Sequence, residues 1–317
     1  MLGRLLNTWL RWVVNLLLRL TMKPIWARGI TIEGLRRQTA ATDRLMARLE
    51  GTPSASAVDA GGVAAEWIEP PQGGARGVLL YLHGGGWCVH LPIAYRRHAL
   101  ELARRSGLRV LLPDYRLAPE HPYPAALDDC CAAYRWLLAR GVAPTRLAVA
   151  GDSAGGNLTL ALLLRLKREG LPLPACAAAL SPLTDFSPTS SSLAFNARSD
   201  VMFTAEASRL MGEPYVRDTP LTDPGVSPLY GDWAGLPPLL FQASAAEMLL
   251  CDSVRAAERA RAAGVAVTEQ IWPGLPHVFQ LFRRLREARE ALDGIGAHLR
   301  LHIPDAVGVA AVPQETP

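Results

Sequence analysis

Short apolar runs alternate with longer amphipathic stretches over most of this chain, from about residue 63 to residue 298. The apolar runs predict strands, and they cover residues 63–68, 78–82, 109–112, 147–150, 175–180, 239–242 and 268–272. The amphipathic stretches predict helices, and they cover residues 95–105, 125–139, 154–167, 252–263 and 278–298. Strands that alternate with helices in this way indicate an α/β fold, in which helices flank a mostly parallel central sheet on both faces.

Two segments, residues 1–50 and 185–232, do not follow this alternation. Both have helical patterns, and the second contains several Phe and Met residues. We expect the two segments to lie together above the sheet as a helical cap, so that residues 51–184 and 233–302 form the two parts of the core. Residues 303–317 lack periodicity and are rich in Ala, Val and Pro, which predicts a disordered tail.

The first 20 residues are rich in Leu and Trp, but they predict a surface helix and not a membrane span. Their longest uncharged run, residues 12–18, is far shorter than the roughly 20 apolar residues that a spanning helix needs, and no cleavage pattern follows it. The polar positions form one narrow stripe, made of Arg4, Asn7, Thr8, Arg11, Asn15 and Arg19. We expect this uncleaved helix to pack over the domain, and the pattern leaves open a peripheral contact of residues 1–20 with a membrane.

The composition excludes several classes of protein. Of the 317 residues, 50% are hydrophobic and 20% are charged, which is enough apolar material to bury a core and excludes disorder, collagen and coiled coil. The net charge is only +4 and the basic residues are scattered, so no nucleic-acid partner is expected. The five cysteines form no CxxC pair and the histidines have no metal-ligand spacing, so we expect a cytoplasmic location and neither a metal nor another cofactor.

The segment Gly151-Asp152-Ser153-Ala154-Gly155 matches the pattern GxSxG. A predicted strand leads directly into it and a predicted helix leads directly out, which is the context of a nucleophile elbow. A turn this tight strains the residue at its tip and brings neighbouring backbone close, which explains the flanking glycines. Ser153 is therefore the predicted nucleophile; the alternative is a plain glycine-rich turn into a helix.

A second glycine cluster, His83-Gly84-Gly85-Gly86-Trp87, follows the predicted strand at residues 78–82. Consecutive glycines let bare N–H groups approach a reacting oxygen, and the carboxyl end of a strand is where open sheets bind ligands. We assign the N–H groups of Gly85 and Gly86, together with that of Ala154, to an oxyanion hole. His83 is expected to orient this loop, and Trp87 is a predicted substrate-binding residue.

A serine hydroxyl needs a base, because it is a poor nucleophile at neutral pH. We choose His277, since its turn lies between the last predicted strand and the last predicted helix, at the same sheet edge as Ser153. The acid that orients this histidine should follow the penultimate strand, where Glu247 and Asp252 compete. We favour Glu247 because it lies nearer to the strand, whereas Asp252 directly precedes a helix in the position of an N-cap.

The order Ser, acid, His along the chain is that of α/β-hydrolases. Chymotrypsin-like proteases have a similar GDSGG stretch, but their His precedes the Ser in an all-β fold. The motifs together resemble those of the hormone-sensitive-lipase-like esterases of the α/β-hydrolase fold: residues 83–87 are similar to the HGGGW loop and residues 151–157 to the GDSAGGN elbow. The resemblance covers about residues 60 to 300. It implies an N-terminal helical cap, and it places Glu247 where that family usually has the catalytic Asp.

The leading hypothesis is a carboxylic-ester hydrolase, in which Ser153 attacks the carbonyl and His277, oriented by Glu247, transfers the proton. The resemblance implies a small-molecule ester substrate with a short to medium, uncharged acyl chain, and the sequence leaves a homodimer open. One alternative is a ligand-binding protein on a hydrolase scaffold, since the plant gibberellin receptors resemble this family and lack the catalytic His. Another is an amidase or transacylase, which would use the same three residues.

Overall fold

A single eight-stranded sheet forms the centre of the molecule. The computed structural model describes residues 2–187 and 189–304, with side chains from residue 7 onward. The strands are β1 (Ser56–Asp59), β2 (Ala64–Ile68), β3 (Val78–Leu82), β4 (Arg109–Pro113), β5 (Leu147–Asp152), β6 (Cys176–Leu180), β7 (Leu239–Ser244) and β8 (Val267–Trp272). Their order across the sheet is β1-β2-β4-β3-β5-β6-β7-β8. All neighbours from β4 to β8 in this order are parallel, and β2 is antiparallel to both β1 and β4, so the predicted mostly parallel sheet is confirmed.

All seven predicted strands are present, each within two residues of its predicted ends. The strand that the apolar pattern did not predict is β1. It lies at the edge of the sheet and three of its four residues are exposed, so it has no apolar run to mark it. By contrast, every residue of β3 is buried, because helices cover both faces of the sheet there.

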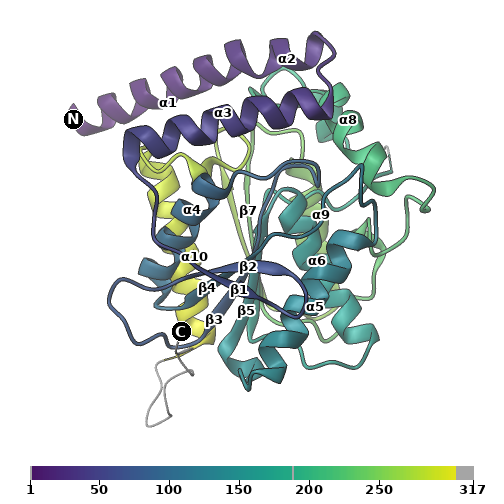
Figure 1. Ribbon diagram of the computed structural model, residues 1–317. Helices are drawn as coiled ribbons and strands as arrows, with labels where there is room; N and C mark the ends of the chain where they lie inside the picture. Colours follow the sequence, from purple (N-terminus) through teal and green to yellow (C-terminus); the bar gives the residue numbers. More distant parts are fainter. Residues whose placement is uncertain (1, 188, 305–317) are drawn as a thin grey trace.

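Ten α-helices of the described chain surround the sheet. They are α1 (Leu2–Thr21), α2 (Lys23–Ala27), α3 (Ile32–Glu50), α4 (Pro92–Ser106), α5 (Ala125–Ala139), α6 (Ala154–Arg168), α7 (Ser192–Phe195), α8 (Ala205–Val216), α9 (Leu250–Ala262) and α10 (Arg286–His302). Helices α4 and α10 cover one face of the sheet, and α5, α6 and α9 cover the other (Figure 1). Successive residues of β3 contribute to the two cores in turn, as the two-residue period of a strand requires.

The last helix begins at Arg286 and not at residue 278 as predicted. Val278 has a left-handed backbone conformation (φ 49°, ψ 46°), and a short 3-10 turn, Phe279–Leu281, follows it. An α-helix cannot pass through a left-handed residue of this kind, so the turn that carries His277 extends further than the apolar pattern indicated. At the other end of the helix, Ile303, the first residue of the predicted tail, is fully buried in the core and Pro304 is exposed, whereas residues 305–317 lie outside the described residues.

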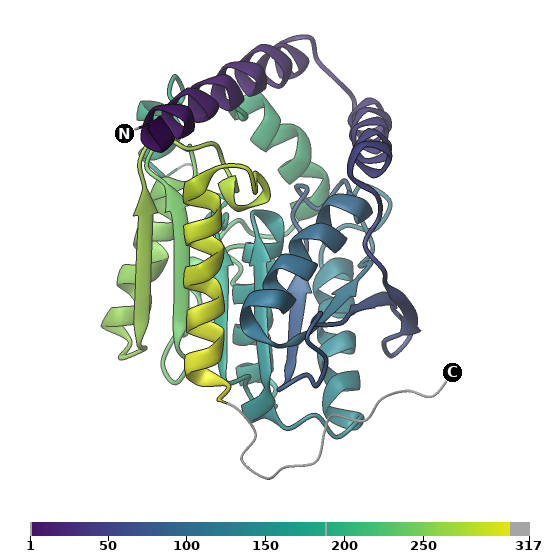
Figure 2. The same ribbon diagram turned by 90° about the vertical axis from the view of Figure 1, so that its left-hand side faces the viewer.

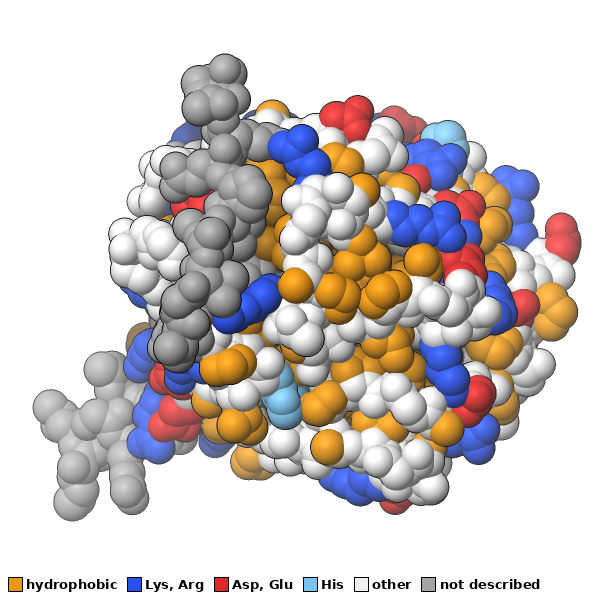
Figure 3. Space-filling view, turned by 90° about the horizontal axis from the view of Figure 1, so that it is seen from below, with side chains coloured by type: hydrophobic (Ala, Val, Ile, Leu, Met, Phe, Trp, Pro, Cys, Tyr) orange, Lys and Arg blue, Asp and Glu red, His pale blue; other side chains and the backbone are white. Residues whose placement is uncertain are grey.

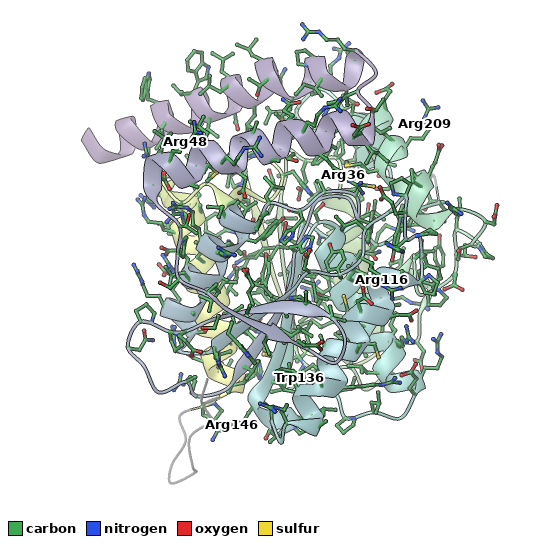
Figure 4. All side chains as sticks on the ribbon, in the orientation of Figure 1. Arg36, Arg48, Arg116, Trp136, Arg146 and Arg209 are labelled. Atoms are coloured by element: carbon green, nitrogen blue, oxygen red, sulfur yellow. The ribbon has the colours of Figure 1, made fainter. Side chains whose placement is uncertain are left out.

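Helices α1, α2 and α3 lie across one end of the molecule, at the top of Figure 1, and Figure 2 shows α1 and α3 on opposite sides of that end. They contact the segment that contains α7 and α8. The Trp26 ring stacks on Phe203 at 6.1 Å, and its Nε1 donates to the carbonyl oxygen of Met202 at 2.8 Å. Arg36, labelled in Figure 4, joins α3 to the core by donating to the carbonyl oxygens of Cys88 and Ala118. Among the described helices, none combines the length and apolarity that a bilayer span requires.

Candidate active site

Ser153 lies at the tip of a sharp turn between β5 and α6. Its backbone has a positive φ (φ 53°, ψ −117°), a conformation that costs energy for any residue with a side chain. The flanking glycines are sterically required: a Cβ atom at Gly155 would collide with the carbonyl oxygen of Leu82, and one at Gly151 would collide with the carbonyl oxygen of Gly155. The turn therefore presents the serine hydroxyl at the carboxyl edge of the sheet.

The loop after β3 brings unpaired N–H groups to this serine. Gly85 and Gly86 have φ values of 118° and 59°, which favour glycine, and in the described part of the chain their N–H groups donate to no protein acceptor. Ala154 is the first residue of α6, and the first N–H groups of a helix have no partner within it. Gly86, Ser153 and Ala154 line one cavity. The three N–H groups are thus available to a substrate oxygen.

A buried carboxylate holds this loop against the serine turn. Oδ1 of Asp152 accepts hydrogen bonds from the Tyr81 hydroxyl at 2.8 Å and from the Gly84 N–H at 3.1 Å, and Oδ2 accepts from the Tyr95 hydroxyl at 2.8 Å. Burial raises the pKa of Asp152, and the two tyrosine hydrogen bonds oppose that rise. The sequence analysis assigned Asp152 no role. The available signal was an acidic residue at the end of an otherwise apolar central strand.

His277 and Glu247 form a buried hydrogen bond. The His277 Nδ1 atom lies 2.6 Å from Glu247 Oε2, and Glu247 Oε1 accepts the Ser244 N–H at 2.9 Å. Because an ionised carboxylate only accepts, Nδ1 carries the proton and Nε2 keeps its lone pair. In the described residues Nε2 has no hydrogen-bond partner, and His277 and Ser153 line the same two cavities. The arrangement leaves an imidazole nitrogen free to act as a base beside the serine.

Opposing effects act on the His277 imidazole. Burial by itself lowers its pKa, but the charge and hydrogen bond of Glu247, followed by the charges of Asp200 and Asp152, raise it. The net result is a His277 pKa above the usual value of 6.5. The phenyl ring of Phe203 packs edge-on against the imidazole at 4.9 Å and excludes solvent from one side of it.

Residues between β6 and α8 hold the loop that carries Glu247. Asn196 Nδ2 donates to the carbonyl oxygens of Ala245 at 3.0 Å and of Glu247 at 2.8 Å, and Asp200 Oδ2 accepts the Met248 N–H at 2.9 Å. Both Asn196 and Asp200 are buried. The sequence did not predict these two residues, because about fifty residues separate them from their partners and no local motif marks them. They position the acid and do not contact the imidazole through a hydrogen bond.

Asp252 has a different role from the one predicted. The N-cap of α9 is Leu249, so the N-cap prediction for Asp252 was wrong, because the helix begins two residues earlier than the pattern indicated. The Asp252 Oδ1 atom instead accepts the N–H groups of Thr184 at 2.7 Å and Asp185 at 3.0 Å. Burial raises the pKa of this carboxyl to about 6. Asp252 therefore fixes the chain where β6 leads into the following segment.

Trp87 and His83 occupy the two ends of the glycine loop. The indole of Trp87 stacks on Tyr215 at 4.4 Å and also lines the smaller cavity next to Ser153. The His83 Nδ1 atom is 2.7 Å from the Gly84 carbonyl oxygen, and its ring stacks on Tyr115 at 4.1 Å. Burial holds the pKa of His83 well below its usual value, so the ring is neutral and serves to orient the loop.

His83, His90 and Asp114 bring potential metal-ligand atoms within 4.8 Å of one another, a cluster that sequence spacing did not indicate. The two imidazoles stack at 4.1 Å with only 10° between their planes. The lone pair of an imidazole nitrogen lies in the ring plane, so the lone pairs of two parallel stacked rings do not converge on one ion. His90 also bonds to Asp114, with 3.0 Å between Nδ1 and Oδ1. This geometry fits an aromatic stack better than a metal site.

Two cavities meet at Ser153 and His277. The smaller has a volume of about 40 Å³, and its far wall comes from the segment after β6 and from the acid loop, including Leu193 and Leu249. The larger has a volume of about 360 Å³ and extends under the N-terminal helices, where Leu18 lines it. Both are lined mainly by apolar side chains. The serine thus lies between a small apolar space and a large one.

Comparison with known proteins agrees with this geometry. The model of a family described as alpha/beta hydrolase fold matches residues 79–281. An acetyl-hydrolase from Streptomyces hygroscopicus is 39% identical over 251 residues, which cover 79% of this chain and 84% of the relative. The putative acetyl-hydrolase LipR from Mycobacterium tuberculosis is 33% identical over 288 residues, which cover 90% of this chain and 93% of the relative.

Solved structures with similar folds identify the subgroup of α/β-hydrolases to which the chain belongs. An esterase from the bacterial hormone-sensitive lipase family superposes with a TM-score of 0.82 at 41% identity, over 86% of this chain and 92% of that one. A crystal structure of EstE5 superposes with a TM-score of 0.87 at 35% identity, over 92% of this chain and 98% of that one. The chain belongs to the α/β-hydrolase family and, within it, to the hormone-sensitive-lipase-like esterases. It is an enzyme, a serine hydrolase of the carboxylesterase and lipase-like class, which decides against the alternative of a ligand-binding protein.

The two competing acids can be distinguished by isosteric amides. Glu247→Gln should lower kcat on a nitrophenyl ester by roughly 10⁴-fold, the effect expected when an orienting acid is lost. Asp252→Asn should keep most of the activity, because an Asn Oδ1 can still accept the two N–H groups. Thermal unfolding of both variants checks that they fold. The opposite ranking in kcat would show that the acid has been assigned to the wrong residue.

The raised pKa of His277 predicts the pH dependence of the reaction. A base must be deprotonated, so kcat/KM should fall as the pH drops through a value above 6.5. Asp200→Asn removes a negative charge that favours the imidazolium. The midpoint of the pH profile of kcat/KM should therefore move to lower pH, independently of any change in the maximal rate. Glu206→Gln is the control, since this acid of α8 is exposed and the acids that raise the His277 pKa most are Glu247, Asp200 and Asp152. An unchanged midpoint in a folded Asp200→Asn variant would contradict the assignment.

Proposed function

We propose that this enzyme hydrolyses carboxylic esters with a triad of Ser153, His277 and Glu247, through an acyl-enzyme. The observation that carries the proposal is the imidazole of His277: its Nδ1 is bound to a buried carboxylate, and its Nε2 is free in the cavities that Ser153 also lines. A buried imidazole held in this way has the tautomer and the position of a general base.

The reaction follows from these positions. Nε2 of His277 takes the proton from the Ser153 hydroxyl as the oxygen attacks the ester carbonyl, and the charge of Glu247 stabilises the imidazolium. The N–H groups of Gly85, Gly86 and Ala154 bind the oxyanion, each contributing about 3 kcal/mol to lowering the barrier. His277 then returns the proton to the departing alcohol. Water, activated by the same nitrogen, releases the acyl group, so the chain's own groups supply all the chemistry.

The two cavities suggest how the ester lies. We assign the acyl chain to the smaller cavity, whose 40 Å³ favours short chains, and the alcohol to the larger one of 360 Å³. The apolar lining of both favours uncharged groups. Two relatives named acetyl-hydrolases support a short acyl chain. Segments 1–50 and 185–232 supply the outer walls of these cavities, and we infer that together they form the cap of the enzyme.

Chemical labelling tests the nucleophile directly. A fluorophosphonate probe should label the wild-type protein covalently, and peptide mass spectrometry should place the label on Ser153. Ser153→Ala should abolish both labelling and turnover of a nitrophenyl ester, down to the residual rate that an oxyanion hole alone supports. Ser54→Ala, a substitution of an exposed serine far from the site in sequence, is the control and should label normally. Labelling of a different serine would reject the mechanism.

Substitution of cavity walls tests the assignment of acyl chain and alcohol. Wild-type kcat/KM should decline along a series of nitrophenyl esters from acetyl to decanoyl. Leu193→Ala enlarges the smaller cavity and should improve the hexanoyl-to-acetyl ratio by roughly tenfold, the effect of one or two methylenes in an apolar pocket. Leu18→Ala enlarges the larger cavity and should leave this ratio unchanged. If Leu18→Ala shifts the acyl preference and Leu193→Ala does not, the two cavities have the reverse roles.

A further inference from the structure

Helix α1 is attached to the rest of the molecule by its polar stripe. Asn7 Nδ2 donates to both carboxylate oxygens of Glu287, at 2.8 and 2.9 Å, and Asn15 Nδ2 donates to the carbonyl oxygen of Gly274 at 3.0 Å. One turn further, Arg19 donates to the carbonyl oxygen of Arg198 at 2.8 Å. At 100° per residue these three residues fall within about 120° around the helix axis, so they lie on one side of the helix. That face is turned toward the protein.

A few apolar residues accompany the polar stripe on this inner face. Leu10 and Val14 pack against a small buried cluster that includes Phe279 and Leu285, and Leu18 lines the larger cavity. The inner face of α1 therefore has both polar and apolar contacts.

The outer face of α1 is apolar and exposed. Trp9, Trp12, Leu16, Leu17 and Leu20 have exposed fractions of 59%, 60%, 36%, 56% and 62%. At 100° per residue, Trp9, Leu16 and Leu20 lie opposite the inner-face residues Asn7 and Leu18. Figures 1 and 2 both show α1 at the outermost edge of the molecule. An amphipathic helix normally turns such a face inward, so this one is oriented for something outside the chain.

The segment that contains this face carries charges of one sign. Residues 1–32 contain five basic residues, namely Arg4, Arg11, Arg19, Lys23 and Arg28, and no acidic residue. The opposite end of the molecule is different: Figure 3 shows basic and acidic side chains interspersed there among apolar ones. Of the five basic residues in residues 1–32, Arg11 lies 3.8 Å from Glu287 of α10, and the other four have no acidic partner within the segment itself. A helix with exposed Trp and Leu on one face, in a segment whose own charges are all basic, complements a surface that is apolar inside and negatively charged outside.

We propose that α1 docks this enzyme on the surface of an anionic lipid bilayer, with Trp9, Trp12, Leu16 and Leu20 inserted among the lipid headgroups. Tryptophan favours this interface, because its ring is apolar and its N–H remains hydrated. Each basic residue near an anionic membrane adds about 1 kcal/mol of attraction. A second copy of the chain is the less favourable occupant, because residues 1–32 of two copies together carry ten basic residues and no acidic one.

The docked orientation also indicates the source of the substrate, an inference that rests on the proposed function. The same N-terminal segment lines the larger cavity through Leu18, Met22 and Ile25, and that cavity reaches Ser153. An ester dissolved in the bilayer would therefore enter beneath α1 and reach the serine along apolar side chains. The substrate class that fits is a lipophilic ester whose alcohol part is large and whose acyl chain is short.

Vesicle flotation tests the docking. The wild-type protein should float with vesicles of phosphatidylglycerol and phosphatidylcholine, and weakly or not at all with phosphatidylcholine alone. The double variant Trp12→Ser/Leu16→Ser should bind anionic vesicles at least about tenfold more weakly, and Arg28→Gln about fivefold more weakly, the equivalent of one lost charge. The matched control is Leu221→Ser/Leu301→Ser, which removes two exposed leucines elsewhere on the surface and should bind as the wild type does.

Turnover of a water-soluble nitrophenyl acetate should be the same in all these variants, which separates docking from folding and from catalysis. Absence of wild-type binding to anionic vesicles would overturn the proposal, and so would equal binding of the Trp12→Ser/Leu16→Ser variant. Analytical ultracentrifugation without lipid tests the other occupant. If the wild-type protein is a dimer and the Trp12→Ser/Leu16→Ser variant is a monomer, the outer face of α1 binds a second copy of the chain instead. Failure of the triad would be recognised separately, as vesicle binding without fluorophosphonate labelling of Ser153.

Discussion

The hydrogen bond between His277 and Glu247 is the constraint around which this site is organised. Both side chains are buried, and a carboxylate without water must have its oxygens satisfied by protein donors. Glu247 therefore needs the imidazole on one oxygen and the Ser244 N–H on the other. Ser244 is in turn tied to the histidine turn, because its hydroxyl donates to the Leu275 carbonyl oxygen at 2.6 Å. Two loops from the ends of β7 and β8 are thereby held in one arrangement.

A second buried carboxylate holds the turn of Ser153, the proposed nucleophile, in the same way. Asp152 connects the end of β5 to the glycine loop after β3 through Tyr81, Tyr95 and the Gly84 N–H. The strained backbone of Ser153 persists because its neighbours on both sides are fixed, one by this network and the other by the first turn of α6. The glycine loop and the Ser153 turn are therefore held in one arrangement, which is what preorganised stabilisation of a developing charge by the proposed oxyanion donors requires.

The sequence predicted the sheet, because buried parallel strands leave continuous apolar runs, and it predicted the elbow, because its glycines have a local steric reason. The edge strand β1 was missed because exposed residues leave no such run. The start of α10 was misplaced because the left-handed Val278 interrupts the helix without any change in hydrophobicity. Asn196 and Asp200 were missed for a different reason. They act through hydrogen bonds to backbone groups about fifty residues away, and such contacts leave no periodic pattern in the sequence.

The orientation of α1 could not be predicted from the hydrophobic pattern. A large difference between two helix faces predicts that one of them is buried, but it does not say which one, because a narrow polar stripe can be satisfied by a polar surface as well as by water. Here Glu287 and the Gly274 carbonyl oxygen supply that polar surface. Gly274 lies in the same turn as His277, so the helix that presents its apolar face outward is hydrogen-bonded to the loop that carries the predicted base. The turn that contains Gly274 and His277 therefore connects helix α1, with its exposed apolar face, to the proposed active site.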